Sequence, residues 1–246
     1  MELLRQLFGS ASGPSERQIA RAMKQATQPH GDAGVRLGAM ERLAGWKTRG
    51  AAAALLRRFT VQVPQASMDH EEKQYAVRLL VDMGRIAIEP ILQFLVSESE
   101  VTWPLHALRE LLPPPEFTET VKNILDKLAG TYTRWPDAKK VMIEHLPDQA
   151  FPELRETVLR YLDDDDDDVC IAAIDYLARC GDADVREHLL KVFLDAGDLR
   201  PRVRGRILDH LCEREWPVKG YRKRVEEAIT DPFYLTSKGT VKRRTV

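Results

Sequence analysis

The stretch Val169-Cys-Ile-Ala-Ala-Ile-Asp-Tyr-Leu-Ala178 decides the fold of this chain. Within it, Ala173, Ile174 and Leu177 stand at offsets 0, +1 and +4, which place three apolar side chains on one stripe of an α-helix. The same offsets recur five more times, beginning at Ala39, Ala76, Ala107, Met142 and Ile207. Successive stripes begin 31 to 37 residues apart. This self-similarity predicts a tandem array of one structural unit.

A second amphipathic segment follows each stripe after a break in the helical pattern. The breaks contain residues that end helices, such as Gly45, Gly84 and the run Pro113-Pro114-Pro115. No run with a period of two is long enough to predict a sheet. The pattern therefore predicts a lone helix over 15–28 and six helix–turn–helix units over 32–60, 69–97, 101–129, 136–162, 166–196 and 199–229.

Helical pairs of this kind bury their apolar stripes only by stacking on one another. The predicted fold is accordingly all-α, a right-handed α-α superhelix, or solenoid, of about six pairs plus the N-terminal helix. We expect a flexible N-terminus over 1–14, the solenoid over 15–230 and an aromatic and basic tail over 231–246. In that tail, Phe233 and Tyr234 are expected to cap the last pair while the basic end stays mobile; the alternative is a docking motif.

Two segments carry a resemblance to a known family. Leu162 is followed by six aspartates, Val169 and the Ala173–Leu177 stripe, and Asp32, Val35 and Ala39-Met40 repeat that arrangement near the N-terminus. An acidic turn that leads into such a helix resembles the start of a HEAT repeat. Over roughly 32–229 the chain is similar to bacterial HEAT-repeat proteins of the type also found in phycobilin lyases. It departs from the common pattern at Cys170, where an arginine is usual.

Composition limits the compartment and the class of the protein. The chain has 246 residues, of which 43% are hydrophobic and 30% charged. It contains no uninterrupted apolar run of membrane-spanning length, and the segment Met1–Phe8 is too short and too acidic for a signal peptide. Its three cysteines, Cys170, Cys180 and Cys212, lie among apolar helical residues, which predicts buried free thiols and a cytoplasmic protein.

The run Asp163–Asp168 is the strongest local anomaly in composition. A calcium loop requires alternating oxygen ligands, a glycine and a distal glutamate, and that spacing is missing here. The favoured interpretation is a solvated loop whose last aspartates cap the next helix, and an acidic docking patch is the alternative. The six histidines fit no zinc motif, and His70-Glu71 is the only His-Glu dipeptide, so we expect no metal, no cofactor and no catalytic residues.

Charge is distributed unevenly along the chain. The net charge is +6 over residues 1–60, −4 over 61–147, −10 over 148–198 and +7 over 199–246. In a linear array these zones are separated in space, so they either steer charged partners or serve solubility alone.

The expected function is a non-catalytic scaffold or adaptor that binds a protein or peptide along the concave face, which the second helix of each pair would line. Lys122, Arg155, Arg222 and Lys223 are the predicted polar contacts on that face. The alternatives are a DNA-directed protein of the HEAT-like alkylpurine glycosylase type, which would need a basic groove with aromatic side chains, and a phycobilin-lyase-like enzyme. A nucleic-acid partner is thus the less favoured expectation, and no membrane span is expected.

Overall fold

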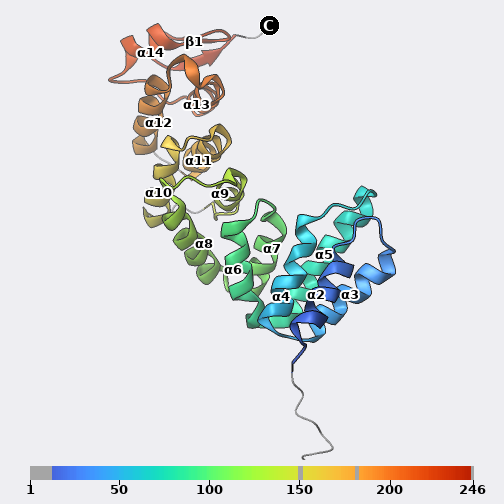
Figure 1. Cartoon of the computed structure of the whole chain (residues 1–246). Coiled ribbons are helices and arrows are strands. Elements are labelled where there is room, and N and C mark those ends of the chain that lie inside the picture. The colour runs from blue at the N-terminus through green and yellow to red at the C-terminus, as the bar shows by residue number, and fades with distance from the viewer. Residues whose placement is uncertain (1–12, 149–151, 181–182, 245–246) are drawn as a thin grey trace, which may run out of the picture. The chain divides into compact units, whose positions relative to one another are not determined.

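The computed structural model describes residues 13–148, 152–180 and 183–244. The described chain is mostly helical, as predicted, and has one short hairpin near its C-terminal end (Figure 1). It divides into two compact units, the first ending at Phe117 and the second beginning at Thr118. The two units are described separately below, and the single solenoid domain expected over 15–230 stays a prediction.

Helices of the first unit pack in alternating order. Helix α3 lies against α5, and α5 lies against α7, while α4 packs on α6. The N-terminal helix α2 covers both α3 and α4. The elements are α2 (Glu16–Ala26), α3 (Ala33–Gly45), α4 (Arg49–Leu56), η1 (Arg57–Thr60), α5 (Ala66–Met83), η2 (Gly84–Ala87), α6 (Ile88–Ser97) and α7 (Thr102–Leu111).

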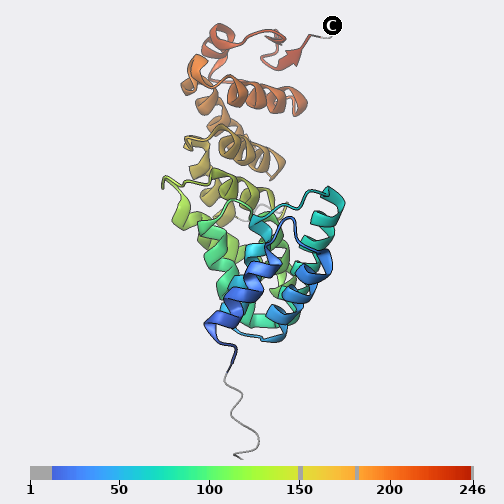
Figure 2. The same cartoon turned by 45° about the vertical axis from the view of Figure 1, so that its right-hand side comes forward.

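The second unit repeats this order. Helix α9 packs on α11, α11 packs on α13, and α12 contacts α14; Figure 2 shows the same helices from a second direction. The elements are α8 (Pro114–Leu128, whose first turn contains the division between the units), α9 (Pro136–Glu144), α10 (Pro152–Leu159), η3 (Arg160–Asp163), α11 (Asp167–Cys180), α12 (Ala183–Asp195), η4 (Gly197–Leu199), α13 (Pro201–Glu213) and α14 (Arg222–Ala228).

Local sequence explains where several helices begin. Ser15 and Gln18 form a capping box at α2, in which the Gln18 N–H donates to Ser15 Oγ and the Ser15 N–H donates to Gln18 Oε1. Asp32 Oδ1 accepts the Val35 N–H at 3.0 Å at the start of α3. Proline stands in the first turn of α9 and α13, where its missing N–H costs nothing.

The predicted stripes lie in the core. All of their residues are buried except Leu111, which is half-buried. Burial of a leucine or isoleucine side chain contributes about 1.5–3 kcal/mol each, so this shared seam is the main source of stability for each unit. The stripe prediction is therefore confirmed for both units.

The C-terminal segment differs from the prediction of a mobile basic end. Strands β1 (Phe233–Leu235) and β2 (Val241–Arg243) form an antiparallel hairpin in which Leu235 faces Val241. Phe233 and Val241 are buried, whereas Tyr234 is 39% exposed. Three-residue strands are too short to show a period of two in the sequence, and the hairpin packs on α13 through β2. Only Phe233 of the two expected capping aromatics is therefore buried.

The loop before α14 holds the hairpin turn in place. The Val218 N–H donates to the Gly239 carbonyl at 2.8 Å, and Arg222 Nη1 donates to the Ser237 carbonyl at 2.8 Å. Gly239 has φ 78°, in the left-handed region that glycine occupies without strain. These contacts hold the hairpin in place, and the basic residues of the hairpin are therefore part of the fold instead of a mobile end.

A buried charge cluster connects α3, η1 and α5 in the first unit. Glu72, whose side chain is 3% exposed, accepts hydrogen bonds from Arg36 Nη2 at 2.7 Å and from Arg58 Nη2 at 3.0 Å. Asp69 pairs with Arg58 at 2.8 Å and with Lys73 at 2.8 Å. Burial raises the pKa of the Glu72 carboxyl, but the hydrogen bonds from Arg36 and Arg58 outweigh it, so its pKa lies below the ordinary value.

None of the helices in the described part of the chain combines the length and the apolar character that crossing a membrane requires.

Candidate interaction site

A buried cation recurs at one position of the repeat. Three residues before the first residue of a stripe stand Arg36, Lys73, Lys139 and Arg204, and all four are buried. Three of them donate to a carbonyl of the loop that precedes their own helix, namely the carbonyls of Gly31, Thr131 and Gly197. Each of these three cations thereby fixes the connection that leads into its own helix.

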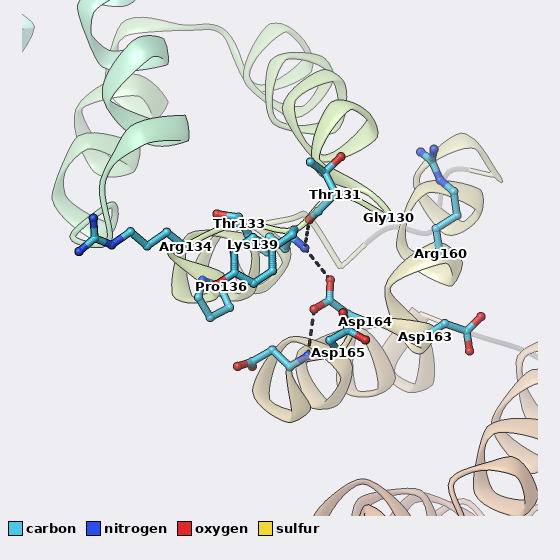
Figure 3. Close-up of a pocket in the computed structure, with 12 residues that line it drawn as sticks. Gly130, Thr131, Thr133, Arg134, Pro136, Lys139, Arg160, Asp163, Asp164 and Asp165 are labelled. Carbon is cyan, nitrogen blue, oxygen red and sulfur yellow. Dashed lines mark hydrogen bonds and ion pairs between the residues drawn. The ribbon is translucent and has the colours of Figure 1, made fainter.

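Lys139 lies between the two sides of an open cleft in the second unit. Its Nζ donates to the Thr131 carbonyl at 3.0 Å and to Asp164 Oδ2 at 2.7 Å, and its side chain is 5% exposed (Figure 3). One lysine therefore ties the loop between α8 and α9 to the acidic loop between η3 and α11. A buried charge with two good acceptors holds its geometry tightly, since separating them would leave a charge without a partner.

The cleft between these two loops has a volume of about 480 Å³. One side is Gly130–Arg134 and Pro136, and the other is Arg160 and Asp163–Asp166, with Lys139 between them (Figure 3). Tyr132 is 89% exposed, so it presents its ring at the cleft without any packing to retain it. An exposed aromatic ring beside ordered charges is a common feature of protein-binding surfaces.

The six aspartates of the acidic loop have different roles. Asp164 binds Lys139, and Asp166 Oδ1 accepts the N–H groups of Asp168 at 2.9 Å and Val169 at 3.1 Å, which caps α11. Asp167 pairs with Arg200 at 2.7 Å, and Asp168 pairs with Arg202.

Asp163 and Asp165 are the other two members of the run. Both are exposed and line the cleft, and within the described residues neither side chain makes a hydrogen bond or an ion pair. The favoured interpretation is therefore confirmed in part: the run caps α11, but through Asp166 and not through its last aspartates, and two of its carboxylates stay available.

Cys170 stands where four of the other repeats have a buried cation. Burial raises the pKa of Cys170 to about 11, so it is a thiol, and its Sγ donates to the Leu162 carbonyl at 3.1 Å. The charged contact to the loop before α11 comes instead from the following helical pair. Arg200 Nη2 donates to the Asp164 carbonyl at 2.9 Å. Arg200 thus makes the contact to the loop before α11 that a buried cation makes at the corresponding position of other repeats.

The side of the cleft that contains Arg160 is anchored to α8. Tyr161 donates its hydroxyl hydrogen to the Leu125 carbonyl at 2.5 Å, and Arg160 pairs with Asp126. Asp126 also accepts hydrogen bonds from Lys122 Nζ and from Thr157 Oγ1, each at 2.7 Å. Burial raises the pKa of Asp126, but these donors outweigh it and lower its pKa overall.

The four predicted contact residues all lie in the second unit, on three different helices. Lys122 on α8 is engaged with Asp126 at 2.7 Å, and Arg155 on α10 lies 3.9 Å from Asp184. Arg222 at the start of α14 holds the hairpin turn, and its neighbour Lys223 is exposed. Arg222 and Lys223 are close to each other only because they are neighbours in the sequence. The other contacts show that Lys122, Arg155 and Arg222 each interact with another residue of the chain.

The residues that the sequence analysis missed are Tyr132 and Lys139, together with the special position of Asp163 and Asp165 within the acidic run. A signal for Lys139 was present, because a cation precedes four of the six stripes by three residues. No signal in the sequence distinguishes Asp163 and Asp165 from their neighbours. Within the described residues, no group of three or more His, Cys, Asp or Glu side chains is placed to hold a metal ion.

Comparisons of this chain with protein-family models, with curated proteins and with solved structures return no match.

Proposed function

We propose that this protein is a non-catalytic interaction module, a HEAT-like solenoid that binds a segment of a partner protein in the cleft beside Tyr132. The repeat is supported by polar links between consecutive pairs. Arg36 to Glu72 and Tyr75 to Glu41 span 36 and 34 residues in the first unit, and Arg160 to Asp126 and Arg206 to Asp175 span 34 and 31 residues in the second. These separations match the spacing of the stripes, which favours one repeated arrangement of helices.

The observation that carries the binding proposal is the division of the six aspartates. Asp163 and Asp165 are exposed at the cleft, whereas Asp164, Asp166, Asp167 and Asp168 have structural partners. Two carboxylates on an ordered loop, opposite an exposed tyrosine, suit a partner segment that carries a lysine or arginine next to an apolar residue. The cation of that segment would face Asp163 and Asp165, and its apolar part would cover Tyr132.

Site-specific photo-cross-linking tests this function. A photoreactive phenylalanine analogue replaces Tyr132, and the protein is irradiated in cells of the organism from which it comes. The matched control places the same group at Leu199, which is 94% exposed and lies outside the cleft. We expect a discrete protein adduct from position 132 that position 199 does not give. The same adducts from both positions, or none from position 132, would contradict the proposal.

A further inference from the structure

A second cleft lies in the first unit, between α2 and the C-terminal end of α3. Its volume is about 350 Å³. The residues around it combine guanidinium groups, amides and an indole ring: Gln18, Arg21, Ala22, Gln25, Arg42 and Trp46. This cleft belongs to different helices from the cleft beside Tyr132 and is argued independently of it.

The two guanidinium groups of this cleft carry uncompensated charge. Arg42 Nη2 donates to the amide oxygen of Gln25 at 2.6 Å, which orients the guanidinium but does not neutralise it. Among the described residues, neither Arg21 nor Arg42 is paired with a carboxylate, and Glu41, the neighbour of Arg42, is occupied by the Tyr75 hydroxyl at 2.7 Å. Two like charges that line one cleft repel each other, so an anion between them would relieve that repulsion.

The two guanidinium groups and the indole ring of this cleft indicate which anion it would bind. Two arginines match a phosphate monoester, which carries a charge of about −1.5 to −2 at neutral pH, better than they match a single carboxylate. Arginine also binds phosphate oxygens through paired N–H groups. The half-buried Trp46 adds a flat apolar surface, and among the described residues its indole N–H makes no hydrogen bond.

We infer that this cleft binds a phosphate monoester joined to a flat ring, as in a nucleoside monophosphate, with the phosphate between Arg21 and Arg42 and the ring against Trp46. The surrounding sequence favours anions, because residues 1–60 carry a net charge of +6. Ala22, which is 3% exposed, contributes a small apolar side chain to the lining.

The test is a titration of the full-length protein with adenosine monophosphate, inorganic phosphate and adenosine, followed through the indole N–H signal of Trp46 in nuclear magnetic resonance spectra. Trp46→Phe assigns that signal. Arg21→Gln and Arg42→Gln each remove one guanidinium, and Lys24→Gln is the matched control because it removes one exposed charge from the same helix outside the cleft.

We expect adenosine monophosphate to shift the Trp46 signal and to bind more tightly than either phosphate or adenosine. Arg21→Gln and Arg42→Gln each weaken that binding by about tenfold, the effect of one lost charged hydrogen bond, whereas Lys24→Gln changes it by less than about twofold. Three outcomes would overturn the inference: no shift at millimolar nucleotide, an equal loss in Lys24→Gln, or phosphate alone binding as tightly as the nucleotide. A phosphotyrosine peptide is titrated in the same way, and tighter binding of that peptide than of the nucleotide would overturn the assignment to a nucleotide.

Discussion

The first unit contains a buried charge network between helical pairs, whereas the second contains partly exposed ion pairs beside its one buried pair described above, Lys139–Asp164. In the first unit, Arg36, Arg58 and Glu72 are almost fully buried and form one network. In the second unit, the pairs Arg202–Asp168 and Arg206–Asp175 are partly exposed to solvent. A buried charge that loses its partner costs much more than an exposed one, because water cannot replace the lost contact. The buried network of the first unit therefore carries a large energetic constraint, and these partly exposed pairs of the second unit carry a small one.

The largest effect is expected from removing the shared carboxylate of the buried network. Glu72→Ala leaves Arg36 and Arg58 buried without their partner, which should lower the free energy of unfolding by about 3–5 kcal/mol. The free energy of unfolding is measured by urea denaturation, monitored with circular dichroism. The control is Glu71→Ala, since Glu71 is exposed, and it should change stability by less than about 0.5 kcal/mol. Equal losses in the two variants would show that the network contributes nothing specific.

Acidification should remove part of the same contribution. The folded-state pKa of Glu72 lies below its ordinary value despite burial, because of Arg36 and Arg58, and the pKa of Asp69 is likewise lowered despite burial, by Lys73 and Arg58. Their contribution is thus fully present above the unfolded pKa of about 4 and is lost as pH falls below it. Urea midpoints between pH 6 and pH 3 should fall more steeply for the wild type than for Glu72→Gln, and parallel curves would contradict the assignment.

An intermediate loss of stability is expected from a substitution in the cleft beside Tyr132. Lys139→Met removes the partner of Asp164 and the donor to the Thr131 carbonyl, and should cost about 2–3 kcal/mol. Hydrogen exchange of the loop before α9 should also accelerate. The neighbouring Lys140→Met is the control, because Lys140 is only half-buried and does not line the cleft. Unchanged exchange in Lys139→Met would mean that Lys139 does not order that loop.

The helix cap of α11 provides a smaller test within one acidic run. Asp166→Ala removes the acceptor of two backbone N–H groups and should cost about 1 kcal/mol. Asp165→Ala, one residue away, should cost less than about 0.5 kcal/mol, because its side chain is exposed at the cleft. Thermal unfolding of both variants decides this, and a larger loss from Asp165→Ala would reverse the roles given to the two residues.

The smallest effect is expected from the exposed pair Arg202–Asp168. Arg202→Ala should change the free energy of unfolding by less than about 0.5 kcal/mol, and the difference should vanish in 1 M salt. The loss caused by Glu72→Ala should persist in the same salt, since salt screens buried charges weakly. A salt-resistant loss in Arg202→Ala would break the distinction between the buried network and the exposed pairs.

The sequence predicted the helices and the core well because both depend on a local period. The stripe that begins at Ala173 needs only offsets of 1 and 4 to be recognised, and its burial follows. The hairpin at Phe233 was missed because its pairing joins two three-residue segments through Gly239 and the Val218 backbone, contacts that no local pattern encodes.

The site was predicted less well than the fold. Six identical aspartates cannot be told apart until the positions of Lys139, Arg200 and Arg202 are known. Lys122 and Arg155 were chosen for their charge and helix face, and the structure engages both in contacts within the chain. Contacts within the chain thus decide which charges stay available for a partner.

The claim that two of the six aspartates serve binding is tested most directly by the yield of the cross-link at position 132 in two double variants. Asp163→Asn with Asp165→Asn should abolish the adduct and leave the melting temperature unchanged. Asp167→Asn with Asp168→Asn should retain the adduct and lower the melting temperature slightly. Loss of the adduct in the second variant, or its persistence in the first, would contradict the account.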